Sequence, residues 1–148
     1  MMLALQPDPK SGFTQAVGIG GIGTGVTFQL EGDQTLGREE SRLGALLKGR
    51  DYCKLHIVEH YLATLMGSKA AGSRFRLAAI GVVGEDLAGH QLLREMSEAG
   101  IDTRWVRKDP DHATLFSTCF VYPNGEGGNI TAGNSAAATL EERDLGHG

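Results

Sequence analysis

Three glycines near the start of the chain have the spacing of a dinucleotide-binding loop. Gly18, Gly20 and Gly23 satisfy the pattern G-x-G-x-x-G. In dinucleotide-binding domains this loop leads into a helix, whose N-terminus holds the pyrophosphate. Here residues 26–33 follow, a short β-prone run that Gly32 breaks, and no helix is expected to begin there. The cluster keeps a nicotinamide-dependent oxidoreductase as an alternative function, and the missing helix counts against it.

A second pattern that could do chemistry is a short histidine motif. His56, Glu59 and His60 form H-x-x-E-H, which puts two imidazoles one helical turn apart, as in the inverted zinc-protease motif. A zinc hydrolase would need a third ligand and a partner that orients the histidines. Glu126 and Glu141 are the candidates, but neither lies in a recognisable ligand context. A zinc hydrolase is therefore a second alternative, and no metal ligand is assigned.

Residues 51–66 are predicted to form the helix that carries these histidines. Asp51 is a plausible N-cap, and Gly67 is a plausible stop. Four residues at helical spacing should form the stripe that packs on the core: Leu55, Val58, Leu62 and Leu65.

The clearest element pattern is a strand, a helix and a second strand within residues 75–106. The run begins with an apolar stretch typical of a strand buried on both faces. Asp86 can cap the helix that follows, and Gly100 can end it in the left-handed conformation. The short connections predict a βαβ unit and therefore a parallel sheet.

The same stretch carries a family resemblance. Residues 80–89 read I-G-V-V-G-E-D-L-A-G, and residues 99–103 read A-G-I-D-T. This is similar to the ribokinase-like (PfkB) carbohydrate kinase family, which has a G-x-V-G-x-D-x-x-G turn, a helix and then G-[IV]-D-[TV]. The glycines shape a strand-to-helix turn, so these residues identify the fold more than they perform chemistry.

The resemblance continues through a β-rich segment. Residues 114–122 are a threonine-led strand, and residues 123–128 reverse the chain before a return strand. Residues 133–138, G-N-S-A-A-A, resemble the family's G-A-N-A-A. The resemblance covers about residues 13–145, roughly the first half of a typical member.

The expected fold is α/β, a mainly parallel sheet flanked by helices, ribokinase-like and truncated. Residues 1–12 are expected to be a loose lead-in, and residues 13–148 the substrate-side part of the kinase domain. A small β lid is expected around residues 26–45 and 114–131.

The resemblance implies the substrate-binding part of an ATP-dependent sugar or nucleoside kinase, which transfers the γ-phosphoryl of ATP to a substrate hydroxyl with Mg²⁺. Four residues are expected to face the substrate, and two more to lie where lid and hinge approach it: Gly20, Thr24, Lys54 and His56, then Thr114 and Asn134. The chain departs from the family where the helix should open with G-G-x-x-x-N. It also has Thr24 where an acidic residue usually binds substrate hydroxyls. These departures suggest an atypical substrate or a divergent subgroup of the family.

The family's G-x-G-D motif, which supplies the catalytic base and an anion site, does not occur in this sequence. No catalytic residue is therefore assigned, and the 148 residues are expected to be inactive alone. A non-catalytic binding module stays open as a third alternative. Exposed strand edges in the 114–131 segment are expected to favour a homodimer through the lid.

Composition sets the remaining bounds. Of 148 residues, 41% are hydrophobic and 22% charged, as in an ordinary soluble domain. The net charge of −4 does not favour a nucleic-acid partner. No apolar run approaches a membrane span, and the start does not resemble a signal peptide, so a cytoplasmic protein is expected. Cys53 and Cys119 are expected to be reduced thiols.

Overall fold

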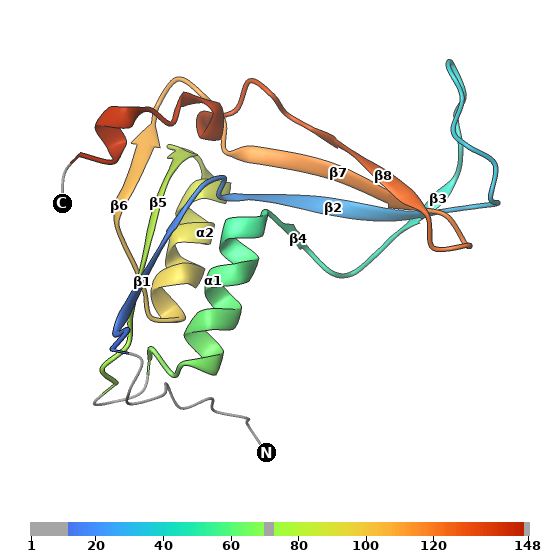
Figure 1. The fold of residues 1–148 in the computed structure, drawn as a ribbon. Coiled ribbons are helices and arrows are strands. Elements are labelled where there is room, and N and C mark those ends of the chain that lie inside the picture. Colours follow the sequence, from blue (N-terminus) through green and yellow to red (C-terminus); the bar gives the residue numbers. More distant parts are fainter. Residues whose placement is uncertain (1–11, 70–72, 147–148) are drawn as a thin grey trace.

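A three-stranded parallel sheet forms the body of the molecule. The computed structural model describes residues 12–69 and 73–146, so most of the expected lead-in lies outside the described residues. The strands are β1 (Gln15–Ile19), β5 (Arg76–Gly84) and β6 (Ile101–Asp109), in the order β1-β5-β6. Helices α1 (Lys54–Leu65) and α2 (Leu87–Glu98) lie together on one face of this sheet (Figure 1).

A second sheet extends away from the body, and we call it the projecting sheet (Figure 1). Its strands are β2 (Gly23–Leu30), β3 (Gly44–Leu46), β4 (Asp51–Tyr52), β7 (Leu115–Val121) and β8 (Gly127–Thr131). The order is β3-β2-β7-β8, with β4 also paired to β2. Strands β2 and β7 are parallel, and the other pairs are antiparallel. Two short 3₁₀ turns follow: η1 (Ala136–Thr139) and η2 (Glu142–Asp144).

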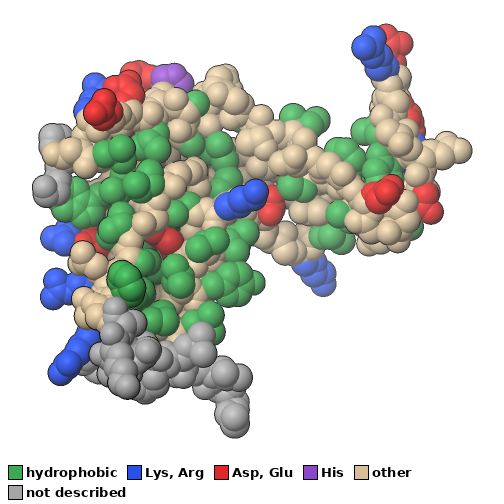
Figure 2. Space-filling model, in the orientation of Figure 1, with side chains coloured by type: hydrophobic (Ala, Val, Ile, Leu, Met, Phe, Trp, Pro, Cys, Tyr) green, Lys and Arg blue, Asp and Glu red, His purple; other side chains and the backbone are tan. Residues whose placement is uncertain are grey.

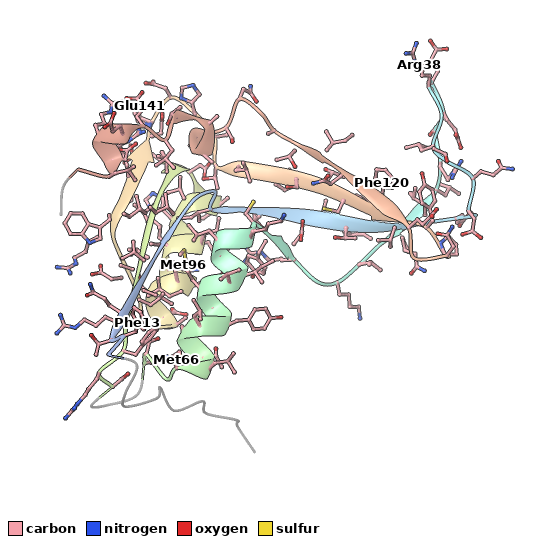
Figure 3. The ribbon with its side chains drawn as sticks, in the orientation of Figure 1. Phe13, Arg38, Met66, Met96, Phe120 and Glu141 are labelled. Atoms are coloured by element: carbon pink, nitrogen blue, oxygen red, sulfur yellow. The ribbon has the colours of Figure 1, made fainter. Side chains whose placement is uncertain are left out.

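The hydrophobic core lies between the parallel sheet and the two helices. Leu77 and Val83 of β5 pack there with Leu92 and Met96 of α2, and all four side chains are almost fully buried. Figure 3 labels Met96 within this layer. The loop between β2 and β3 lies far from the core, with Arg38 at its tip (Figure 3). No described helix combines the length and the apolarity that crossing a membrane requires.

The strand–helix–strand prediction for residues 75–106 is confirmed. Asp86 is the N-cap of α2, and its side chain accepts a hydrogen bond from the Gly89 amide. Gly100 follows the helix with φ +87°, a conformation that favours glycine. Strand β6 pairs in parallel with β5, so the α/β fold expected from the sequence is correct.

The prediction for the first helix is only partly right. Helix α1 begins at Lys54 after Cys53, and Asp51 lies in β4 instead of capping the helix. Val58, expected in the core, is 54% exposed. The buried face carries His56 and Glu59, because α1 is rotated relative to the apolar stripe read from the sequence.

Candidate functional site

The projecting sheet leaves the body at the carboxyl ends of β1 and β5. Strand β1 ends at Ile19 just before β2 begins, and β5 ends at Gly84 beside the start of β7. In open parallel α/β sheets, ligands bind outside the carboxyl ends of the strands. We call this junction the hinge, and it is the candidate site.

The glycines that resemble a dinucleotide loop allow close packing at the hinge. A Cβ atom on Gly18 would lie 2.3 Å from Oε1 of Glu59, and one on Gly23 would lie 2.5 Å from the carbonyl oxygen of Leu115. The Gly20 amide donates to the carbonyl of Ile80 at 3.1 Å. Strand β2 begins at Gly23, so no helix N-terminus faces a pyrophosphate here. The nicotinamide alternative therefore gains no support from the fold.

The turn from β5 to α2 is fastened to the projecting sheet by Asp86. Its Oδ2 accepts from the Thr114 amide at 2.8 Å, and its Oδ1 accepts from the Thr114 hydroxyl at 2.7 Å. The same hydroxyl accepts from the Gly84 amide at 2.9 Å. Burial alone would raise the pKa of Asp86, but hydrogen bonds from Gly89 and Thr114 hold it below its usual value. We call these four residues the Asp86 corner.

Glycine is required twice in the Asp86 corner by close approach. A Cβ on Gly84 would lie 2.5 Å from the Thr114 amide nitrogen, and one on Gly89 would lie 2.3 Å from the Gly84 carbonyl oxygen. Such distances are too short for any side chain. The family turn motif is therefore a packing and hydrogen-bonding unit that sets the angle of the hinge.

A buried carboxylate fixes the loop after β6. Asp109 accepts hydrogen bonds from the amides of Asp111 and His112 and from the Thr139 hydroxyl. The amide of Asp111 contributes most to holding the pKa of Asp109 well below its usual range, although burial opposes this. Sequence reasoning gave Asp109 no role. The Asp109-Pro110 pair is a local turn signal that could have indicated the bonds to Asp111 and His112, whereas Thr139 is 30 residues away.

Next to helix α1, the hinge contains buried polar side chains that make fewer hydrogen bonds than the Asp86 corner does. His56 is 4% exposed and lies between the rings of Tyr52 and His60, with ring centroids 4.4 Å and 4.1 Å away. Burial, together with the neighbouring His60, lowers the pKa of His56 to about 4. Glu59 is 1% exposed, and burial raises its pKa to about 7. Nε2 of His56 and both carboxyl oxygens of Glu59 lack a hydrogen-bond partner among the described residues.

The structure gives the six predicted site residues different surroundings. Gly20 lies in the turn after β1, and the Thr24 hydroxyl donates to the carbonyl of Asp51 at 3.2 Å. Lys54 and Asn134 are exposed. Thr114 and His56 are buried, and the Thr114 hydroxyl is occupied by the Asp86 corner. These placements favour positioning roles for the two buried residues.

The histidine motif is not joined by further metal ligands. In the described ranges, no three His, Cys, Asp or Glu side chains gather in a way that could hold a metal ion. Nδ1 of His60 lies 2.8 Å from the carbonyl oxygen of His56, inside the helix. The zinc-hydrolase alternative therefore gains no support from the fold.

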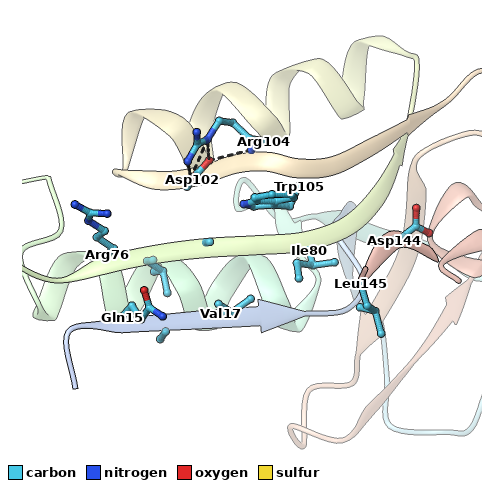
Figure 4. Close-up of a pocket in the computed structure, with 12 residues that line it drawn as sticks. Gln15, Val17, Arg76, Ile80, Asp102, Arg104, Trp105, Asp144 and Leu145 are labelled. Atoms are coloured by element: carbon cyan, nitrogen blue, oxygen red, sulfur yellow. Dashed lines mark hydrogen bonds and ion pairs between the residues drawn. The ribbon is translucent and has the colours of Figure 1, made fainter. Parts of the chain in front are cut away.

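A cavity of about 420 Å³ lies on the face of the parallel sheet that the helices leave bare (Figure 4). Val17, Ile80 and Trp105 line it, beside a charged pair in which Arg104 donates to Asp102 at 2.6 Å. None of the six predicted site residues lines this cavity. Parallel sheets are normally covered on both faces. The apolar lining of this cavity is therefore explained by packing, and we do not assign it as the ligand site.

The protein has an α/β body, a projecting β-sheet and a candidate ligand site at the hinge between them. The sequence model of the pfkB family of carbohydrate kinases matches residues 62–146, which include the Asp86 corner, β7 and β8. The chain belongs to the pfkB family. Among curated protein sequences, none matches the chain.

Solved structures with the same fold are sugar kinases. Ribokinase from Giardia lamblia is 18% identical with a TM-score of 0.66, and the match covers 90% of this chain and 37% of that one. Ribokinase from Cryptococcus neoformans var. grubii in complex with ADP is 16% identical with a TM-score of 0.61, covering 84% and 36%. Fructokinase from Xylella fastidiosa with bound ATP is 15% identical with a TM-score of 0.57, covering 89% and 37%. At these identities the likeness shows the fold alone, and the chain spans 36–37% of the length of these structures.

Proposed function

We propose that this chain is the substrate-binding part of an ATP-dependent kinase that phosphorylates a hydroxyl of a sugar or nucleoside. The observation that carries the proposal is that the family match covers the Asp86 corner and two strands of the projecting sheet. These elements fix the projecting sheet at the carboxyl edge of the parallel strands, where substrates bind in α/β proteins.

The proposed phosphoryl donor is ATP with Mg²⁺. Such a reaction depends on positioning and on neutralising phosphate charge, and a base accepts the proton of the substrate hydroxyl. We assign none of the described residues to the nucleotide, the metal or the base. Gly20, Thr24, Lys54 and Asn134 are proposed to face the substrate from the hinge, while His56 and Thr114 position them.

Ligand binding tests the proposal. D-ribose, D-fructose and adenosine should raise the thermal midpoint of the chain, because a ligand that binds only the folded state stabilises it by mass action. NADH serves as the control and should have no effect. Stabilisation by NADH alone would overturn the proposal.

Turnover is a separate part of the proposal. With ATP, Mg²⁺ and each sugar, residues 1–148 should release no substrate-dependent ADP, since the G-x-G-D motif is absent from this sequence. If residues 1–148 released ADP as fast as a longer version extended along the natural reading frame, this expectation would be contradicted. Binding without turnover in both forms would favour a non-catalytic module. A cytoplasmic location stays a prediction, which fractionation of cells can check.

A homodimer through the projecting sheet is also proposed. One face of this sheet carries apolar groups that remain exposed, including Ile130 at 74%, Leu46 at 58% and Phe116 at 44%. Figure 2 shows hydrophobic side chains along the sheet as well as over the body. Sedimentation at increasing concentration should show a dimer that Phe116→Asp weakens. A monomer at all concentrations, in both proteins, would overturn this.

A further inference from the structure

The outward sides of the two helices differ in chemistry. Each helix has five exposed residues: Lys54, Ile57, Val58, Tyr61 and Thr64 on α1, and Leu87, His90, Arg94, Ser97 and Glu98 on α2. Apart from its first residue, α2 turns charged and polar groups toward water, as a surface helix normally does. Helix α1 exposes one charge and three large apolar side chains. We call these three residues, Ile57, Val58 and Tyr61, the α1 patch.

The α1 patch is exposed because of the way in which α1 packs on the body. The inward side of the helix buries His56 and Glu59, whose polar atoms lack partners among the described residues. On the outward side, Tyr61 is 67% exposed and Val58 54%. Figure 2 shows hydrophobic side chains over the part of the body where Figure 1 places α1. A helix that is apolar on its outward side is typical of a buried position, so we expect a partner to cover the patch.

The spacing of the exposed residues makes this side of α1 complementary to a copy of itself. Positions 54, 57, 58 and 61 recur every three or four residues, so their side chains lie on one side of the helix. Val58 and Tyr61 lie at equal distances from the midpoint between residues 59 and 60. When two such helices cross antiparallel at this midpoint, Val58 of each copy lies against Tyr61 of the other. A contact about a two-fold axis requires a surface that is complementary to itself in this way.

Charge favours the antiparallel arrangement of two α1 helices. Lys54 is the one charged residue among the exposed residues of α1. In an antiparallel pair the two lysines lie at opposite ends, about 16 Å apart along the helix axis. This separation exceeds the screening length of about 8 Å in physiological salt, so the lysines repel each other little. Each lies toward the last turn of the other α1, the negative end of the helix dipole, which has no basic residue of its own.

We propose that the α1 patch is a self-association surface, on which a second copy of this chain packs its own α1 antiparallel about a two-fold axis. The inference goes beyond the proposed kinase function and does not rest on it. It uses a different surface from the projecting sheet, so two such contacts on one chain build assemblies larger than a dimer. One helix face is smaller than a standard interface of about 800 Å² per partner, so the α1 contact is the weaker of the two.

Sedimentation equilibrium at increasing protein concentration tests the inference. Phe116→Asp serves as the background, because it weakens association through the projecting sheet. This protein should still dimerise at high concentration. Tyr61→Glu in the same background should raise the Kd of the dimer at least tenfold, since a charge is then buried against an apolar side chain. Val58→Glu should have the same effect, and it decides the test if Tyr61→Glu lowers the thermal midpoint.

Leu43→Glu in the same background is the matched control. Leu43 is also a strongly exposed apolar residue, but it lies in the loop between β2 and β3, far from α1 (Figure 1). Its replacement should leave the Kd unchanged within about twofold, as expected for a surface position outside the contact.

Disulfide trapping tests the orientation of the two helices. Val58→Cys and Tyr61→Cys are made as separate proteins, each with Cys53→Ser and Cys119→Ser. An oxidised equimolar mixture should form the covalent dimer severalfold faster than either protein alone, because the two Cβ atoms must approach within about 4 Å. If each protein links to itself as fast as the mixture does, the antiparallel arrangement is wrong.

The outcomes separate this inference from the other proposals. If the Phe116→Asp protein is a monomer at every concentration, the α1 contact is overturned, while the kinase proposal and the dimer through the projecting sheet stand. If it dimerises and both α1 variants dimerise as strongly as Leu43→Glu does, another surface is responsible and the inference fails. Sugar binding is measured separately, so its absence would overturn the kinase proposal alone.

Discussion

The two helices contact the parallel sheet in opposite ways. At the start of α2, Asp86 is hydrogen-bonded to Gly89 and Thr114, and every contact is local to the hinge. At α1, Cys53 occupies the N-cap with no side-chain hydrogen bond, and Glu59 is buried against Gly18 without a hydrogen-bond partner. Hydrogen-bonded polar groups hold α2 in place. Helix α1 is held by close packing, although its buried Glu59 has no hydrogen-bond partner among the described residues.

The difference predicts which contact can change. Gly84 and Gly89 lie in close contact with neighbouring backbone within a hydrogen-bonded network. A side chain added at either position would push apart groups that share several hydrogen bonds. A buried carboxylate without partners already costs free energy, so replacing it can stabilise the fold. Mutations at the α2 contact should therefore lower the free energy of unfolding, whereas some mutations at the α1 contact should raise it.

The largest effect is expected at the α2 contact. Gly89→Ala should lower the free energy of unfolding by about 3 kcal/mol, because the new Cβ would lie 2.3 Å from the Gly84 carbonyl and 2.8 Å from the Thr114 hydroxyl. The better helix propensity of alanine, about 1 kcal/mol, should not offset this. Urea denaturation of the two proteins measures the difference.

Gly133→Ala is the control, because nothing lies within 4 Å of a Cβ atom at that exposed position. It should change the stability by less than about 0.5 kcal/mol. Equal stability of Gly89→Ala and Gly133→Ala would show that the Asp86 corner is not tightly packed.

The next effect concerns Glu59 and depends on pH. Its pKa is about 7 in the folded chain against an ordinary value of 4.5. Between these values the folded state keeps a proton that the unfolded state loses, so the free energy of unfolding falls as pH rises through this window. Glu59→Gln removes this fall and should be more stable than wild type by about 2 kcal/mol near pH 8, with little difference near pH 5.

His56 makes the pH profile diagnostic. Its pKa of about 4 lies below the ordinary 6.5, so it lowers the stability as pH falls through that range, opposite in sign to Glu59. Chemical denaturation from about pH 5 to pH 8 should give a flatter profile for wild type. Glu59→Gln should lose stability only toward acid. A constant offset between the two profiles would show that Glu59 does not titrate in this range.

The contrast also explains how far the sequence could predict this molecule. The βαβ unit and the cap at Asp86 were predictable, because strand periodicity, cap and turn signals agreed within about 30 neighbouring residues. The start of α1 was misplaced, because Asp51 looked like a cap but pairs with Gly25 of β2, far away in the sequence.

The candidate site was harder to predict for the same reason. The two faces of the projecting sheet depend on pairing between β2, β4, β7 and β8. The contact of Asp109 with Thr139 joins residues 30 positions apart. His56 was expected to face the substrate, and Glu59 was noted only as part of a possible zinc motif. Glu59 is buried where α1 approaches Gly18 closely. Whether the six predicted residues contact a substrate stays a prediction.

The smallest effect is expected at the N-cap of α1. Cys53 already has the extended backbone of an N-cap, φ −70° and ψ 156°, but its thiol makes no capping bond. Serine is nearly the same size, and its hydroxyl oxygen accepts hydrogen bonds from helix amides far better than sulfur does. Cys53→Ser should therefore raise the free energy of unfolding by about 0.5–1 kcal/mol. Thermal and urea unfolding under reducing conditions measure the change, and Cys119→Ser controls for loss of a thiol. If Cys53→Ser lowers the stability, burial of the sulfur outweighs capping, and α1 is held by packing even at its first turn.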